Sequence, residues 1–298
     1  MLSDDASFLH FEHLLASGDE NGEEVSRFLN DIIAGSKGRR RKLRKGTTLC
    51  RAQIGYEMRE DFGSRIELPD AFPPERMKPL RDSVSVGRVN PKGRPCLYLA
   101  IDPGTAIAEM RPWRGAYISL GQFRVLKDCL LMDFSDDKLR SADLIWSDEP
   151  PTAVEREESV WGDIAYAFAK PLTRNEELSE YLATQAISER FRQEGYDGVA
   201  YRSALGTGKC IALFDLDSAD LSACALHEVD AVKSTFQQIN NWYCIPKHHQ
   251  RVADSMGIDV CSPEAARPHH LQITGYSRVE QARNAAASEA SPTSDGEV

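Results

Sequence analysis

Three side chains with complementary chemistry lie within one stretch of this chain: Arg88, Tyr98 and Glu109. A guanidinium binds phosphate oxygens through two parallel hydrogen bonds, which an ammonium does less well. A tyrosine ring stacks on a flat ligand or donates its hydroxyl, and a carboxylate stabilises positive charge in a reacting group. One cation, one phenol and one carboxylate on adjacent elements are a common composition of an active site.

A turn, a strand and a helix are predicted to position these residues. Arg88 precedes the turn residues Asn90–Gly93, which break regular structure. Residues 96–101 form an apolar run of strand length. Asp102–Pro103 then provides a helix N-cap and a favourable first helical residue. The predicted helix carries Glu109 about two turns later.

Side-chain alternation along this strand predicts where Tyr98 points. Leu97 and Leu99 should face one side of the sheet, whereas Cys96, Tyr98 and Ala100 should face the other. Tyr98 would stand between two small neighbours, which leaves room for a flat ligand against its ring.

A second group of residues is predicted to complete the site. Arg51, inside a predicted strand, is a candidate anion contact, and Ser203 lies before a glycine-rich turn whose backbone N–H groups can hold a phosphate or a carboxamide. We do not expect Ser203 to act as a nucleophile, because no histidine stands at an evident partnering position. Gln185 and Tyr181 lie one helical turn apart and are candidate pocket residues.

Each candidate also has a purely structural interpretation. Arg88 or Arg51 can form an ion pair, Tyr98 can be an ordinary half-buried strand residue, and Glu109 can be a surface glutamate. The glycines after Ser203 are expected in any tight hairpin turn.

The remaining pattern predicts a mixed α/β or α+β domain with a small, strongly bent sheet flanked by helices. Residues 3–34 have the apolar spacing of one or two helices, residues 35–46 form a basic linker, and residues 56–86 and 135–160 lack regular structure. Further helices are predicted at 161–169 and behind a capping box at Thr173–Glu176, the latter ending at Gly195. Strands are predicted at Thr48–Ile54, Tyr117–Phe123, Cys129–Phe134, Val199–Arg202 and Ile211–Leu216.

Composition restricts the class of protein. The 298 residues are 41% hydrophobic, and no apolar run approaches the roughly 20 residues of a membrane helix. An acidic N-terminus predicts no signal peptide, and seven scattered cysteines predict reduced thiols in a cytoplasmic protein. The net charge of −10 argues against nucleic acid as the main partner, although the basic run 35–46 could contact an acidic partner or a phosphate.

The chain also contains metal-ligand residue types near its C-terminus. Cys244, His248, His249 and Cys261 have the right chemistry for zinc, but their spacing matches no reliable pattern, and the same holds for His269-His270. We therefore predict no metal site.

Several motifs resemble the RES-domain family. They are GRVNPKG, LYLA and AIAEM around Arg88, Tyr98 and Glu109, followed by DGVAYRS and a glycine-rich turn. The family is named after an arginine, a glutamate and a serine, which here correspond to Arg88, Glu109 and Ser203. The resemblance covers roughly residues 47–236. Many relatives have an asparagine near Lys209-Cys210, so one polar contact is expected to differ.

This resemblance implies a fold like that of ADP-ribosyltransferases and a bacterial toxin that consumes NAD. NAD would be a substrate, cleaved by water or by inorganic phosphate, and a cognate antitoxin would be the partner. Glu109 would stabilise the oxocarbenium-like ribose, Arg88 would bind phosphate, and Tyr98 and Ser203 would position nicotinamide. Transfer of ADP-ribose to a protein and a non-catalytic binding module are the alternatives, and the oligomeric state is left open.

The predicted organisation has four parts. An N-terminal helical extension and basic linker (1–46) precede the RES domain (47–236), and a C-terminal extension (237–283) and a disordered tail (284–298) follow it.

Overall fold

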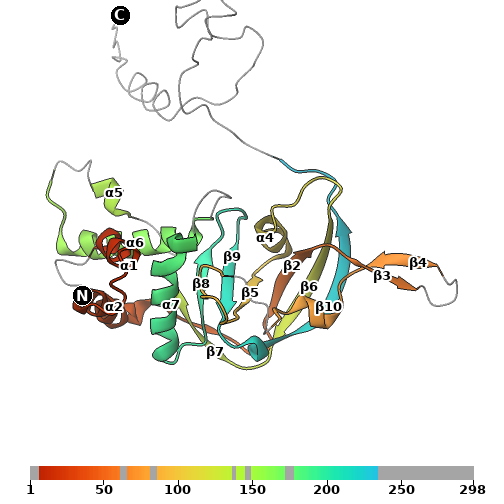
Figure 1. Cartoon of the computed structure of the whole chain (residues 1–298), viewed down its shortest axis with the longest axis horizontal. Coiled ribbons are helices and arrows are strands. Elements are labelled where there is room, and N and C mark those ends of the chain that lie inside the picture. The colour runs from red at the N-terminus through yellow and green to blue at the C-terminus, as the bar shows by residue number, and fades with distance from the viewer. Residues whose placement is uncertain are drawn as a thin grey trace, which may run out of the picture. The chain divides into compact units, whose positions relative to one another are not determined.

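A mixed sheet organises the computed structural model, which describes residues 7–60, 66–80, 86–135, 139–144, 149–171 and 178–233 (Figure 1). Its strands are β1 (Arg40–Leu43), β2 (Thr48–Ile54), β5 (Leu97–Ala100), β6 (Tyr117–Val125), β7 (Cys129–Asp133), β8 (Gly198–Arg202), β9 (Lys209–Leu213) and β10 (Ala219–Glu228). They follow the order β1-β7-β8-β9-β5-β2-β6-β10, and only β7 and β8 are parallel neighbours. The chain divides into two units, 1–232 and 233–298, and only residue 233 of the second is described.

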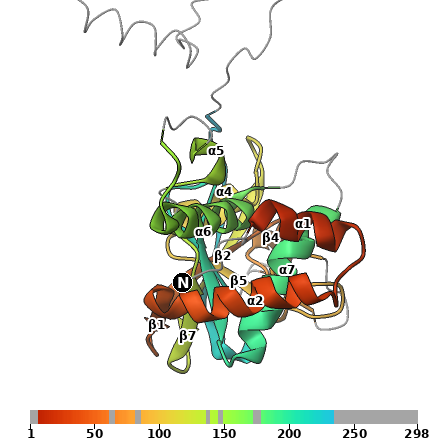
Figure 2. The same ribbon diagram turned by 90° about the vertical axis from the view of Figure 1, so that its left-hand side faces the viewer.

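Helices flank this sheet. They are α1 (Phe8–Ala16), α2 (Glu23–Gly35), α3 (Pro74–Met77), α4 (Pro103–Glu109), α5 (Ser141–Leu144), α6 (Ala153–Ala169) and α7 (Leu182–Gln193), with short 3-10 turns η1 (Ser36–Arg39), η2 (Leu178–Tyr181) and η3 (Leu216–Ser218). Figure 2 shows α1, α2, α6 and α7 gathered on one side. The predicted α+β class, a mixed sheet flanked by helices, is confirmed, whereas the strong bend stays a prediction. The predicted small size of the sheet is wrong, because eight strands pair in it. None of the described helices is long and apolar enough to cross a membrane.

Aromatic packing joins these helices to the sheet. Phe134, directly after β7, stacks on Phe168 of α6 with ring centroids 4.3 Å apart and meets Phe191 of α7 edge-on at 5.7 Å. Phe11 of α1 stacks on Phe28 of α2 at 4.4 Å within the same core. Buried aromatic pairs contribute beyond the area that they remove from water, so this cluster holds four helices against one face.

The predicted alternation along β5 is confirmed. Leu97 and Leu99 belong to the core on one face of the sheet, and Cys96 and Tyr98 contribute to the helix-covered core on the other. The predicted start of the following helix is confirmed too, because the Asp102 carboxylate accepts a hydrogen bond of 2.8 Å from the Thr105 N–H.

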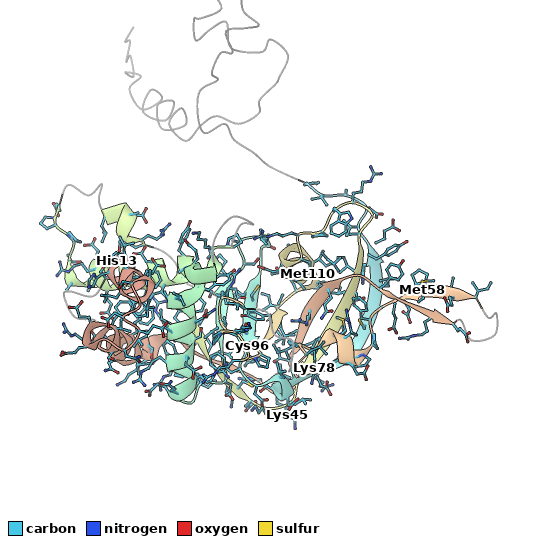
Figure 3. The ribbon with its side chains drawn as sticks, in the orientation of Figure 1. His13, Lys45, Met58, Lys78, Cys96 and Met110 are labelled. Atoms are coloured by element: carbon cyan, nitrogen blue, oxygen red, sulfur yellow. The ribbon has the colours of Figure 1, made fainter. Side chains whose placement is uncertain are left out.

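Two segments predicted to be irregular contain regular structure. Within residues 56–86, β3 (Glu57–Glu60) and β4 (Glu67–Asp70) form an antiparallel hairpin, and α3 follows. Figure 3 labels Met58 on this hairpin, where half of the residue is exposed. Within 135–160, α6 begins early because Thr152 and Glu155 form a capping box. The sequence Thr-Ala-Val-Glu carries this signal.

The basic run also differs from the predicted linker. Residues 36–39 form η1 and residues 40–43 form β1, an edge strand paired with β7. Its basic side chains remain exposed, as is common on sheet edges. The domain boundaries stay predictions. The capping box at 173–176, the cysteine and histidine residues beyond 243, and the segments 237–283 and 284–298 lie outside the described residues.

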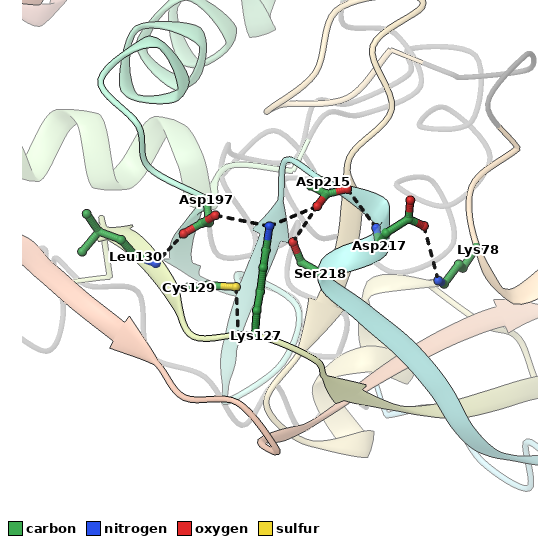
Figure 4. A network of polar contacts seen from close by, with 8 residues as sticks. All are labelled: Lys78, Lys127, Cys129, Leu130, Asp197, Asp215, Asp217 and Ser218. Carbon is green, nitrogen blue, oxygen red and sulfur yellow. Dashed lines mark hydrogen bonds and ion pairs between the residues drawn. The ribbon is translucent and has the colours of Figure 1, made fainter.

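A polar network stabilises the end of the sheet where β7 and β8 begin (Figure 4). Lys127 Nζ lies 3.1 Å from Asp215 Oδ2 and 3.7 Å from Asp197 Oδ1. Asp197 Oδ2 also accepts from the Leu130 N–H at 2.8 Å. The network joins the β6–β7 turn to the starts of β8 and η3. It lies at the opposite end of β8 from Ser203.

Close packing of α6 generates a stability prediction. An alanine normally stabilises a helix interior by about 1 kcal/mol relative to glycine, but a Cβ on Gly162 would lie 1.7 Å from the Leu139 carbonyl oxygen. We therefore expect Gly162→Ala to lower the free energy of unfolding by about 1–3 kcal/mol in urea denaturation. Gly38→Ala, whose Cβ would meet nothing within 4 Å, is the matched control. A stabilised Gly162→Ala protein would contradict this packing.

Candidate active site

Glu109 is held by Ser203 across the gap between α4 and the β8–β9 turn. The Ser203 hydroxyl donates to Glu109 Oε1 at 2.5 Å and accepts from the N–H groups of Leu205 and Gly206 at 3.1 and 2.8 Å. This hydroxyl therefore has one acceptor and two donors. No hydrogen bond from the described residues reaches Glu109 Oε2, so Ser203 fixes one carboxylate oxygen and leaves the other without a partner among these residues.

The β8–β9 turn is fixed in turn by the N-terminus of α4. Thr105 Oγ1 donates to Asp102 Oδ2 at 2.7 Å and accepts from the Gly208 N–H at 2.9 Å. A Cβ on Gly206 would lie 2.8 Å from Thr105 Cα, so the turn approaches α4 too closely for a larger residue. Both ends of α4 thus contact the turn that carries Ser203.

Tyr98 is held by the loop 87–90, which precedes β5. Its hydroxyl donates to Asn90 Oδ1 at 2.7 Å and accepts from the Val89 N–H at 3.1 Å. Burial raises the pKa of this phenol well above its usual range. A Cβ on Gly87 would lie 2.6 Å from the Tyr98 hydroxyl oxygen, which explains the glycine before Arg88. The hydroxyl is occupied by the 87–90 loop.

Gln185 of α7 holds the same loop. Its side-chain amide donates to the backbone carbonyls of Gly87 and Asn90 at 2.8 and 3.3 Å. The structure therefore places Gln185 next to the predicted site, with its amide directed at the backbone that carries Arg88. Tyr181 lies at the start of α7, and its carbonyl accepts from the Thr184 hydroxyl at 3.1 Å.

Arg88 is buried beside the C-terminal end of α6. Its Nη1 donates to the carbonyl oxygens of Phe168 and Ala169, and its guanidinium carbon lies 5.1 Å from the centroid of the Tyr201 ring. The helix dipole and the unpaired carbonyls at a helix C-terminus favour such a cation. No carboxylate of the described residues forms an ion pair with Arg88 within 4 Å, although the negative charge of Glu109 acts on its guanidinium.

Arg51 is not brought together with the other predicted residues. Alternation along β2 places Cys50 and Ala52 towards α4 and Arg51 on the opposite face, the face of Leu49. Its Nη1 donates to the Tyr98 carbonyl at 3.1 Å, and its buried Nε has no hydrogen-bond partner among the residues that the structure describes. Burial lowers the pKa of Arg51 to about 10.

Two residues on the face of Tyr98 were not predicted. Tyr201 of β8 is buried beneath Arg88, and Cys210 of β9 lies opposite it in the strand register. Cys210 Sγ is 3.5 Å from Glu109 Oε1. The alternation in Gly198–Arg202, read forward to Ser203, places Tyr201 on the same side as the serine and could have identified it. The expected difference from the family near Lys209-Cys210 marks this position, but it does not indicate Glu109 as the partner of Cys210.

The arrangement can bind and polarise a ligand on the helix-covered face of the sheet. It brings the Glu109 carboxylate, the Arg88 guanidinium and the rings of Tyr98 and Tyr201 to one side of β8, β9 and β5. The described residues contain no group of three His, Cys, Asp or Glu side chains suited to hold a metal ion.

One of three comparisons with known proteins identifies a family. A family model described as the RES domain matches residues 65–236, which is more than half of the chain. A chain in the crystal structure of the M. tuberculosis MbcT-MbcA toxin-antitoxin complex is 16% identical, with a TM-score of 0.34, over 66% of this chain and 92% of that chain. No curated protein matches the chain. The predicted resemblance to the RES family is confirmed by the family model.

The contacts of the Tyr98 hydroxyl generate a second stability prediction. Tyr98→Phe removes the acceptor of the Val89 N–H and the donor to Asn90 in a buried setting, so we expect a loss of about 1–3 kcal/mol in the free energy of unfolding. The control is Tyr166→Phe, because Tyr166 is 44% exposed and should change stability by less than about 0.5 kcal/mol. Equal effects in both variants would refute a structural role for the Tyr98 hydroxyl.

Proposed function

This chain belongs to the RES-domain family, and we propose that it cleaves the bond between nicotinamide and ribose in NAD. The observation that carries the proposal is the Glu109 carboxylate, held through Oε1 by Ser203 with Oε2 open. Oriented carboxylates of this kind stabilise positive charge on a sugar. NAD is the substrate that the family resemblance implies.

The proposed reaction uses Glu109 electrostatically. As nicotinamide departs as a neutral ring, the ribose gains oxocarbenium-like character, and the nearby carboxylate stabilises it. The open oxygen can also accept a hydrogen bond from a ribose hydroxyl. Water or inorganic phosphate then forms a bond to the ribose carbon and gives up a proton. The Ser203 hydroxyl donates a hydrogen bond to Glu109. We therefore propose that Ser203 orients the carboxylate, in place of the contact with nicotinamide that the resemblance implies.

The cations are assigned to the pyrophosphate. Arg88 already donates Nη1 to the end of α6, and its remaining donors are proposed to bind phosphate oxygens. Arg51 stays a predicted second anion contact.

Tyr98 and Gln185 are assigned to different tasks. The Tyr98 hydroxyl is engaged by Asn90 and Val89, so the ring face is the part proposed to contact nicotinamide. Gln185 holds the loop that carries Arg88 and is proposed to set the position of the guanidinium. A cognate antitoxin as partner rests on the family resemblance alone.

Loss of the carboxylate tests the reaction. We expect purified protein to release nicotinamide from NAD and Glu109→Gln to lower kcat by at least about 100-fold, as when one electrostatic stabiliser is removed. Glu158→Gln changes an exposed glutamate of α6 and should retain wild-type activity. Assays with and without inorganic phosphate identify the acceptor.

Absence of nicotinamide release from folded wild-type protein would refute cleavage by water or phosphate. Incubation of the same protein with biotinylated NAD and cell lysate would then test transfer of ADP-ribose to a protein.

Ser203 provides a separate prediction. If its hydroxyl only orients Glu109, Ser203→Ala should lower kcat by about 10-fold or more and change KM by less than about threefold. A large increase in KM with unchanged kcat would instead indicate that Ser203 binds the substrate directly.

A further inference from the structure

Cys210 lies where it can influence Glu109. It occupies the interior of β9, between Ala100 of β5 and Tyr201 of β8 in the strand register, and is only 4% exposed. Its Sγ lies 3.5 Å from Glu109 Oε1, the oxygen that accepts from Ser203. Two donors from two sides of one hairpin therefore meet the same carboxylate oxygen.

The thiol is in the protonated state that can donate. Burial, and then the negative charge of Glu109, raise the pKa of Cys210 to about 12. A thiol that remains protonated is a weak hydrogen-bond donor and a poor nucleophile. These properties argue against covalent catalysis by Cys210. They are consistent with a hydrogen bond from its thiol to Glu109.

We propose that Cys210 is a positioning residue for Glu109, whose S–H and the Ser203 hydroxyl together fix Oε1 and direct Oε2 towards the substrate. The proposal rests on the proposed function of Glu109. The two donors differ in origin, because Ser203 belongs to the turn after β8 whereas Cys210 belongs to the rigid interior of β9. Glu109, at the end of α4, is thereby held by the sheet as well as by the turn.

Other titratable groups surround this pair. Arg88 acts on the thiol from the loop before β5, and Tyr201 acts on it from β8. Arg88 stays charged and the Tyr201 phenol stays neutral through the acid range.

The split between kcat and KM separates positioning from simple core packing. Loss of one of the two donors loosens the geometry of Glu109, so Cys210→Ala should lower kcat by about threefold or more and change KM by less than about threefold. Cys210→Ser retains a donor and should restore kcat. Cys129→Ala and Cys129→Ser are matched controls, because Cys129 is also buried but lies at the start of β7. An unchanged kcat in Cys210→Ala would overturn the proposal.

A second measurement does not depend on activity with NAD. The infrared S–H stretching band of Cys210 can be assigned from the difference between wild type and Cys210→Ala. We expect this band to move to higher frequency in Glu109→Ala, which removes the acceptor, while the Cys129 band stays in place and reports an intact fold.

The two experiments distinguish failure of this inference from failure of the proposed function. An unmoved Cys210 band would show that the contact with Glu109 is not made. A moved band in a protein that releases no nicotinamide would retain the contact and refute NAD cleavage.

Discussion

The hydrogen bond from Ser203 to Glu109 is the interaction on which the arrangement of this site depends. It joins the end of α4 to the turn after β8, two segments separated by 94 residues in sequence. The bond can form only because Thr105, near the other end of α4, holds the same turn through Gly208. A carboxylate on a short helix would otherwise sample several rotamers, and fixing one of them costs conformational entropy. Here the hydrogen bonds of Ser203 and Thr105 offset this cost within the protein itself.

The remaining architecture places a cation and an aromatic ring on the same face. Alternation along β5, β8 and β9 directs Tyr98, Tyr201 and Cys210 towards the helix-covered side, and the end of α6 fixes Arg88 above Tyr201. The aromatic core between the helices and the sheet therefore also sets the position of Arg88 relative to Glu109. The polar network around Lys127 stabilises the far end of the same strands, where it contributes to the scaffold and not to the chemistry.

Local sequence signals explain why part of the fold and of the candidate site was predictable. The strand at Thr48–Ile54, the alternation around Tyr98 and the N-cap at Asp102 depend on neighbours in sequence, and the structure confirms all three. The start of α6 was missed although its capping box is visible in the sequence, because the charged segment before it suggested irregular structure. The basic run was interpreted as a linker, since seven cations in twelve residues do not distinguish an exposed edge strand from a solvated loop. The partners of Arg88, Ser203 and Cys210 depend on contacts between distant segments, which periodicity does not encode.

The position of Arg88 has a consequence for communication across the molecule. One guanidinium is shared between the terminal carbonyls of α6 and the region proposed to bind the substrate. Any event that displaces Phe168 or Ala169 must change the hydrogen bonds of Arg88, and any anion that attracts Arg88 must act on the end of α6. Thermodynamic linkage makes these two effects equal in free energy. A change at the C-terminal end of α6 would therefore reach the proposed site through Arg88, without any contact with Glu109.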